Sequence, residues 1–129
     1  MNEKRLALTQ SIMELLDDWK LLAKDKITLL GLPEDVRVRH MEQYRKDKAF
    51  PETDKVNEHI VHLVGIADAL RTTYPRNLEM GTLWLKKAHK RLGNRTPMHV
   101  MTEEGLKGIR QVRGILDCTY EWNMTGSVH

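Results

Sequence analysis

Apolar residues recur at spacings of three and four along most of the chain, and nowhere do they alternate with period two over the length of a strand. They predict a helix from Glu3 to Trp19, whose inner face consists of Leu8, Ile12, Leu15, Leu16 and Trp19. A second helix runs from Lys20 or Ala23 to Leu30 and ends at Gly31. The clearest stripe predicts a helix over residues 55–74, capped by Thr53 or Asp54, with an inner face of Val56, Ile60, Leu63, Val64, Ala67 and Leu70. These patterns predict an all-α fold.

Residues 33–48 are predicted as a third helix, because Pro33, Glu34 and Asp35 suit a helix start. A helix, a turn that contains glycine and then a polar helix is the outline of a helix-turn-helix. In such a motif Arg and Gln read base edges, while Tyr and Lys hold phosphates. The residues expected to contact DNA are therefore Arg37, Arg39, Gln43, Tyr44, Arg45 and Lys46.

Several start and stop signals crowd the stretch between Trp84 and Gly105. A helix is predicted from Trp84 through Leu92, and Gly93-Asn94 ends it, since both residues tolerate a left-handed backbone. Thr96 and Pro97 suit the cap and first position of a new helix. A second stop is predicted at Met101, after which Thr102-Glu103-Glu104 looks like the first turn of a last helix. That helix continues to about Tyr120, with Leu106, Ile109, Val112, Leu116 and Tyr120 on one face and Arg110 and Arg113 to the side.

Charge is distributed unevenly. Residues 1–60 hold 11 Lys and Arg against 12 Asp and Glu, a net −1, whereas residues 61–129 hold 10 against 6, a net +4. Much of the excess lies in the window from Lys86 to Arg95, which contains no acid. Such a run is usually a solvated helix face, and here it is also a candidate surface for nucleic acid or an acidic partner. The net −1 of the first half predicts that any DNA binding there is weak and strongly salt-dependent.

The sequence argues against catalysis and against a bound metal or cofactor. His59 and His62 are three apart on a helix, and His89 and His99 flank the predicted turn, but no further ligand has a convincing spacing. Cys118 is the single cysteine, so an intramolecular disulfide is excluded. No phosphate-binding loop or nucleophile motif is present. No apolar run approaches the roughly 20 residues that span a bilayer, and the start of the chain lacks signal-peptide character, so a cytoplasmic, non-membrane protein is expected.

The order of motifs resembles the toxin-binding domain of the Xre/MbcA/ParS antitoxins. Trp84-Leu85 precedes a Leu-Gly-x-Arg-Thr-Pro turn at residues 92–97, and an apolar pair and a glycine follow. Upstream, Leu16-Asp17-Asp18-Trp19 looks like a signature at the end of the family's first helix. The resemblance extends from about residue 12 to 116. The chain departs from the family pattern at Ala88-His89, at Asn94 and in a longer segment between Gly31 and Pro51.

The resemblance implies that residues 1–75 form an Xre-like helix-turn-helix region and that residues 76–129 form the toxin-binding region. It implies a partner, a RES-domain toxin that consumes NAD and whose cleft the antitoxin blocks sterically, without a cofactor. It also implies autorepression through operator DNA and a homodimer or a larger hetero-oligomer with the toxin. The residues expected to contact the toxin are Trp84, Arg95, Arg110, Arg113 and Trp122, while Gly93, Thr96 and Pro97 build the turn.

A rival interpretation belongs to another class of protein. The chain would be a small helix-turn-helix transcriptional regulator whose C-terminal helices serve only for dimerisation. A neighbouring reading frame that encodes a RES-type fold would separate the two.

Overall fold

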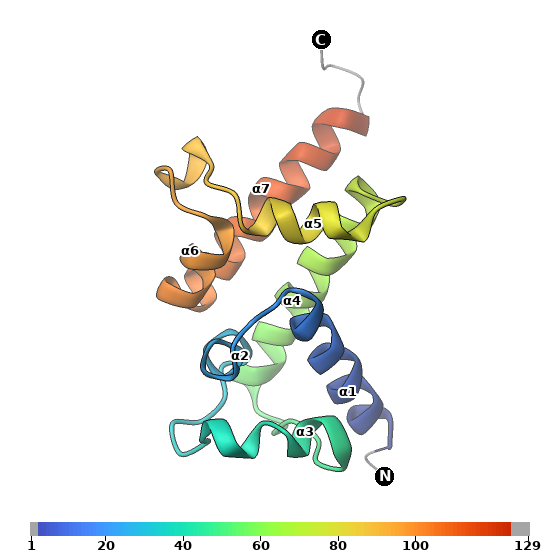
Figure 1. Ribbon diagram of the computed structural model, residues 1–129, viewed down its shortest axis with the longest axis vertical. Coiled ribbons are helices and arrows are strands. Elements are labelled where there is room, and N and C mark those ends of the chain that lie inside the picture. The colour runs from blue at the N-terminus through green and yellow to red at the C-terminus, as the bar shows by residue number, and fades with distance from the viewer. Residues whose placement is uncertain (1–2, 125–129) are drawn as a thin grey trace. The chain divides into compact units, whose positions relative to one another are not determined.

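The computed structural model describes residues 3–124, and for residues 119–124 it describes the backbone only. All regular elements in this range are helical (Figure 1), which confirms the all-α prediction. They are α1 (Glu3–Asp18), α2 (Ala23–Leu30), η1 (Val38–His40), α3 (Gln43–Lys46), α4 (Asp54–Thr73), α5 (Leu78–Leu85), η2 (Lys90–Leu92), α6 (Pro97–Glu104) and α7 (Leu106–Met124). The chain forms two compact units, Met1–Ile60 and Val61–His129, and the boundary between them along the chain falls within α4.

The first two helices of the first unit follow the prediction closely. Of the predicted inner face of α1, Ile12, Leu16 and Trp19 are buried and Leu15 is half-buried, but Leu8 is exposed. At the end of α2, Gly31 has φ +64°, and its N–H and that of Leu32 bond back to the carbonyls of Thr28 and Ile27. This is the Schellman motif, in which a glycine in left-handed conformation closes a helix.

The predicted third helix over residues 33–48 is wrong. Residues 33–37 are irregular, and the rest of the segment holds only the short turns η1 and α3. Two β-branched residues, Val36 and Val38, weaken helix formation here. Tertiary burial then decides the path, because Met41, Tyr44 and Phe50 all lie in the core. Packing of that kind routinely overrides local propensity.

Side chains of α1 fix the loop that leads into α4. Arg5 donates from Nε to the carbonyl of Phe50 (2.9 Å) and from Nη2 to that of Pro51 (2.6 Å). The hydroxyl of Thr9 accepts a hydrogen bond from the backbone N–H of Phe50 at 3.0 Å. As predicted, Thr53 caps α4, since its hydroxyl accepts a hydrogen bond from the N–H of Val56. Polar side chains on α1 therefore hold an irregular segment in place.

An ion cluster joins α1, α2 and α3 in the first unit. Asp17 in α1 accepts hydrogen bonds from Lys26 in α2 and from Arg45 in α3, and Arg45 also pairs with Glu42. Lys26 is only 4% exposed, and a buried charge is costly unless it is paired, so the carboxylate of Asp17 stabilises the buried ammonium group. Burial alone would raise the pKa of Asp17, but the hydrogen bonds from Arg45 and Lys26 outweigh it and lower that pKa below 3.8.

In the second unit, two predicted boundaries are wrong. The helix expected from Trp84 to Leu92 ends at Leu85, and the chain then turns. The expected stop at Met101 is absent, because α6 continues to Glu104 and Gly105 separates it from α7. Residues 102–104 therefore end one helix instead of starting the next.

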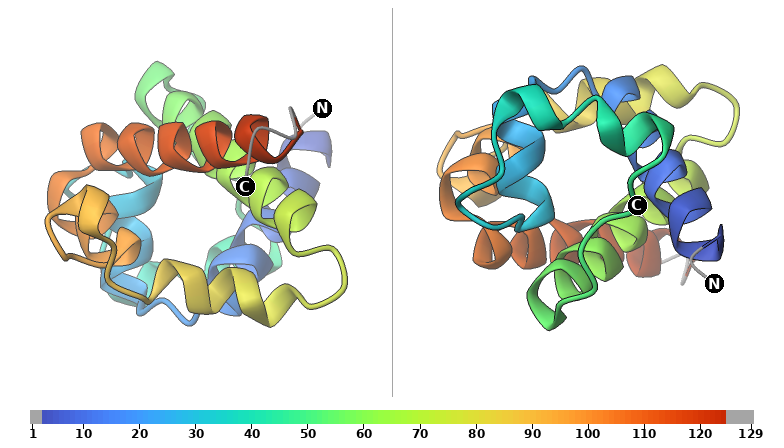
Figure 2. Two further views of the ribbon diagram at one scale, coloured as in Figure 1. Left: turned by 90° about the horizontal axis from the view of Figure 1, so that it is seen from above. Right: turned by 90° about the horizontal axis from the view of Figure 1, so that it is seen from below.

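The first half of α7 lies beside α6 (Figure 2), and within residues 3–124 these two helices contact each other more extensively than any other pair of elements. Their backbones approach closely at Gly108, where a β-carbon would lie 2.3 Å from the carbonyl oxygen of Val100. Ile109, Val112 and Leu116 are buried as predicted, Leu106 is half-buried, and the side chain of Tyr120 lies outside the described residues.

Candidate protein-binding site

A tight turn between η2 and α6 forms the scaffold of the candidate site. Gly93 and Asn94 both have positive φ, +68° and +64°, so the predicted left-handed stop is confirmed. The N–H of His89 donates to the carbonyl of Arg95 (3.1 Å), and the N–H of Asn94 donates to the carbonyl of His89 (3.0 Å). These bonds close residues 89–95 into a loop, with the single isolated β-bridge of residues 3–124 at its base.

Trp84 joins this loop to the end of α5. Its ring lies 4.7 Å from the ring of His89, at an interplanar angle of 39°. His89 Nε2 donates a hydrogen bond to the backbone carbonyl of Trp84 at 3.0 Å. Because His89 is tied to both Trp84 and Arg95, the aromatic side chain and the turn are held as one piece.

The start of α6 is built as the sequence predicts. Thr96 caps the helix by accepting a hydrogen bond from the N–H of His99 (3.0 Å), and Pro97 takes the first helical position. The side chain of Arg95 is itself anchored, since Nε donates to the carbonyl of Leu92 (2.9 Å) and Nη1 lies 2.6 Å from the carboxylate of Glu104. Arg95 is therefore part of the turn as well as part of its surface.

Arg95 and Glu104 line an open groove of about 810 Å³ with three residues of α7, Lys107, Arg110 and Gln111. The groove has three cationic side chains and one carboxylate, a net +2, and that carboxylate already pairs with Arg95. The first turn of α7 contains no acid but does contain Lys107. This arrangement opposes the helix dipole, which favours acids at a helix start, so it does not serve the stability of α7. A groove of this charge is suited to an acidic or phosphate-like group of a partner.

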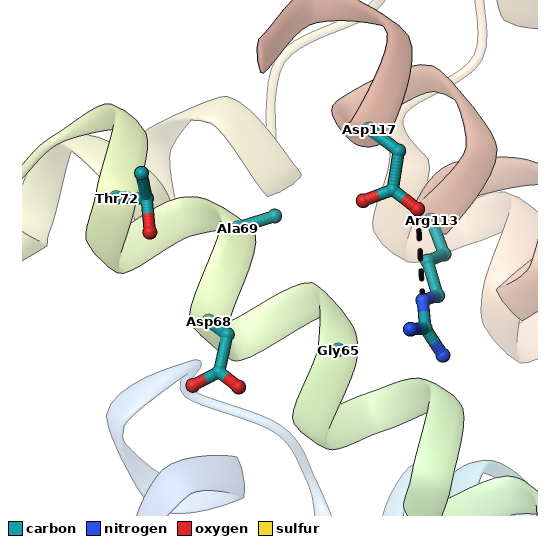
Figure 3. Close-up of a pocket in the computed structure, with 6 residues that line it drawn as sticks. All are labelled: Gly65, Asp68, Ala69, Thr72, Arg113 and Asp117. Carbon is teal, nitrogen blue, oxygen red and sulfur yellow. Dashed lines mark ion pairs between the residues drawn. The ribbon is translucent and has the colours of Figure 1, made fainter. Parts of the chain in front are cut away.

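Arg113 does not face this groove. Its guanidinium lies against Gly65 of α4, where a β-carbon would be 2.5 Å from the Arg113 side chain. Nη1 donates to Nδ1 of His62 (3.2 Å), and Nε lies 3.7 Å from Asp117 (Figure 3). The pocket of about 210 Å³ at this point is lined by Gly65, Asp68, Ala69, Thr72, Arg113 and Asp117. Arg113 of α7 thus packs against α4, and Gly65 leaves room for its guanidinium.

Of the five residues expected to contact a toxin, three are therefore linked. Trp84 contacts His89, the backbone of His89 bonds to that of Arg95, and Arg95 lines the groove with Arg110. Arg113 is separate, and the side chain of Trp122 lies outside the described residues. Sequence reasoning missed Glu104 and Lys107, because no local pattern links residues 95, 104 and 107 before the turn folds.

The six residues expected to contact DNA have different environments in the first unit. Arg37, Arg39, Gln43 and Lys46 are exposed, as that role requires. Tyr44 is 1% exposed and packs against the ring of Phe50 at 5.1 Å, so its proposed role as a phosphate ligand is wrong. Arg45 is engaged with Asp17 and Glu42. No helix longer than four residues presents this set within residues 33–48.

His59 is a core residue. Its Nδ1 donates to the carbonyl of Leu29 at 2.8 Å, and its ring lies on Gly31. Burial lowers its pKa below the ordinary 6.5, against the opposing effect of the Leu29 carbonyl. Among the described residues, no group of three His, Cys, Asp or Glu is placed to hold a metal. Within the same range, no helix is long and apolar enough to cross a membrane.

Comparison with known proteins adds no assignment to this geometry. No family model, curated protein or solved structure matches the chain.

Proposed function

We propose that the chain is the antitoxin of a type II toxin–antitoxin pair, and that its C-terminal region binds and sterically blocks a RES-domain toxin that consumes NAD. One observation carries this proposal. The residues of the family-like turn fold into a closed loop whose Arg95 lines a cationic groove with Lys107 and Arg110. A motif that resembles a toxin-binding domain is thus joined to a surface whose charge suits a binding role.

The chemistry of the groove fits the proposed target. A cleft that consumes NAD binds a ligand with phosphate groups, so it offers positions for anions, and acids at its rim would attract a cationic partner. Arginine is well suited to such contacts, because its planar guanidinium makes paired hydrogen bonds to carboxylates and phosphates. Lys107 and Arg110 are both exposed on α7, so they are the side chains expected to contact the toxin. Arg95, which pairs with Glu104, would set the shape of the groove.

DNA binding is not part of the proposed function. The segment that the sequence assigned to a recognition helix is broken into short turns, and two of its six candidate contacts have structural roles in the first unit. The rival function as a helix-turn-helix regulator therefore has less support than the antitoxin.

The test is rescue of growth when the chain is co-expressed with the RES-type toxin encoded beside it. Replacing Lys107 and Arg110 together by Glu should abolish rescue, because the groove changes from net +2 to net −2. The control is Arg76→Glu, an exposed charge reversal outside the groove. Circular dichroism should show that both variants stay helical.

Full rescue by the doubly substituted chain would remove the groove from the binding surface. Loss of rescue in both variants would mean that rescue depends on the net charge of the chain and not on the charge of the groove. In a binding assay, the unaltered chain and the Arg76→Glu variant should capture the purified toxin, and the doubly substituted chain should not.

A further inference from the structure

The segment between α5 and α6 has a concentration of positive charge. From residue 80 to residue 102 the chain contains five Lys and Arg and no Asp or Glu. Four of these side chains, which we call the loop cations, are exposed: Lys86, Lys87, Lys90 and Arg91. Because Lys86 and Arg91 are five positions apart, their α-carbons are separated by at most about 18 Å even in an extended chain. The loop cations therefore lie close together in the loop that joins α5 to α6 (Figure 1).

The loop cations are not neutralised by acids of the chain. Three other arginines of the second unit do form ion pairs: Arg71 with Asp68, Arg95 with Glu104, and Arg113 with Asp117. None of the loop cations pairs with a carboxylate within residues 3–118, the range in which the structure describes side chains. Like charges held close together repel each other, so this arrangement lowers the stability of the fold. A partner with several negative charges would remove that repulsion.

The backbone that presents these charges is fixed before any partner binds. Leu85 before the loop and Leu92 within it are 0% and 1% exposed. The N–H of Leu92 donates to the carbonyl of His89 at 3.0 Å, and the N–H of Gly93 donates to the carbonyl of Lys90 at 3.0 Å. Because the loop is already ordered, binding has a smaller entropic cost.

Two aromatic rings lie in the same stretch of chain. The ring of Trp84 contacts that of His89, and Nε2 of His89 is bound to the carbonyl of Trp84. Both residues are half-buried, so part of each remains at the surface. In the sequence each ring precedes one pair of loop cations. Aromatic and cationic side chains are therefore interleaved over residues 84–91.

This combination suits a single strand of nucleic acid better than an acidic protein or a duplex. Lys is depleted at protein–protein interfaces, yet three of the four loop cations are Lys, whose ammonium group binds phosphates as a point charge. Readers of duplex DNA place a helix or a two-stranded ribbon in the major groove, whereas the only helical element within residues 86–96 is η2, three residues long. Single strands are bound by cations that follow the backbone and by aromatic rings on which bases stack.

We propose that the loop cations and the Trp84–His89 ring pair form a binding surface for single-stranded nucleic acid of any sequence. The loop cations hold phosphates, and the exposed part of the ring pair stacks on a base. The proposal is independent of the antitoxin function, because it requires no toxin. It also differs from operator binding, in which a helix-turn-helix reads a duplex.

Fluorescence anisotropy of labelled oligo(dT) and oligo(U) with the full chain tests the proposal, and the two oligonucleotides distinguish DNA from RNA as the source of the strand. Four phosphate contacts predict a slope of about −3 for log affinity against log salt concentration, which makes binding about 50-fold weaker at about 200 mM salt than at about 50 mM. Replacing Lys90 and Arg91 together by Gln should reduce this factor to about sevenfold. The matched control replaces Lys24 and Lys55, two exposed lysines of the first unit, by Gln and should keep the full salt dependence.

Two further measurements test stacking. Trp84→Leu should weaken binding about tenfold and leave the salt dependence unchanged, because it removes a ring but no charge. At about 200 mM salt, where charge interactions are screened, oligo(dT) should bind more tightly than its duplex with oligo(dA), a comparison that requires no variant. Circular dichroism checks that every variant is folded.

Four results would each overturn the proposal. The first is the absence of binding at low salt with up to about 100 μM chain, which is the weak end of non-specific affinity. The second is equal loss of salt dependence in the loop variant and in its control. The third is unchanged affinity in a folded Trp84→Leu variant, and the fourth is duplex binding as tight as that of the single strand.

Discussion

Because α6 and α7 approach each other closely, replacing glycine by alanine at two positions of α7 should have opposite effects on the stability of the protein. Gly108 and Gly114 both lie within α7. At Gly108 a β-carbon would meet the carbonyl oxygen of Val100 at 2.3 Å, whereas at Gly114 nothing lies within 4 Å. Gly108→Ala should therefore destabilise the protein, and Gly114→Ala should stabilise it.

The magnitudes follow from two terms. Replacing a glycine inside a helix by alanine gains about 1 kcal/mol of helix stability, and this gain applies at both sites. At Gly114 it is unopposed. At Gly108 it is opposed by overpacking, which typically costs about 1–3 kcal/mol. The upper end applies, because the obstacle is backbone and cannot rotate away as a side chain would. Gly108→Ala should therefore lose about 2 kcal/mol net, roughly 3 kcal/mol less stable than Gly114→Ala.

Urea denaturation followed by circular dichroism measures both variants against the unaltered chain. Hydrogen exchange then assigns the change, since the amides of α6 and α7 should lose protection in Gly108→Ala while those of α1 and α2 keep theirs. Equal stability of the two variants, or a more stable Gly108→Ala, would refute the reasoning and mean that the helices do not approach so closely.

Three further predictions concern the ion cluster, the buried histidine and the α4–α7 contact. Asp17→Asn should lower the free energy of unfolding in urea by about 2 kcal/mol, which is less than the 3–5 kcal/mol lost from a fully buried pair because Asp17 is 39% exposed. The same change should cost clearly less in a chain that already carries Lys26→Met. An equal cost would mean that the two residues are not coupled. Because the folded-state pKa of His59 lies below the unfolded 6.5, its contribution to stability is fully present above pH 6.5 and should be lost as the pH falls below that value. The free energy of unfolding should therefore differ less between pH 7.5 and pH 5.5 in His59→Gln than in the unaltered chain. An equal difference in both chains would contradict the role of His59. Gly65→Ala should be neutral or slightly stabilising by up to about 1 kcal/mol, since the obstacle is the flexible end of Arg113; a loss of more than about 1 kcal/mol would show that Arg113 cannot move aside.

Features set by a few neighbouring residues were predictable from the sequence. The ends of α1 and α2, the Thr53 and Thr96 caps, and the left-handed turn at Gly93 all agree with it. Each of these depends on a side-chain hydrogen bond or a backbone conformation within about four residues, so the local sequence contains the whole cause. The apolar stripes on α4 and α7 were predictable for a similar reason, since helical periodicity alone determines which residues share a face.

The irregular path between α2 and α4 was decided by tertiary structure. Local signals favoured a helix there, but burial of Tyr44 and the pairing of Arg45 with Asp17 stabilise short turns instead. The same pairing gives two charged residues a structural role that the sequence did not show. Asp17 appeared only as part of the Leu16-Asp17-Asp18-Trp19 signature, and Arg45 was expected to contact DNA. Neither role could be corrected without knowing that α1, α2 and α3 meet at one point.

The candidate site shows the same division. The sequence by itself determined that residues 92–97 form a capped turn of a recognisable type, because that turn depends on neighbouring residues. Only the tertiary structure decided that Arg95 shares a groove with Arg110 while Arg113 packs on Gly65, although both arginines of α7 looked equivalent in sequence. The physical reason is that a helix places residues three apart at different angles. Which angle faces a neighbouring element depends on how α4, α6 and α7 pack, and that packing results from contacts between residues far apart in the chain.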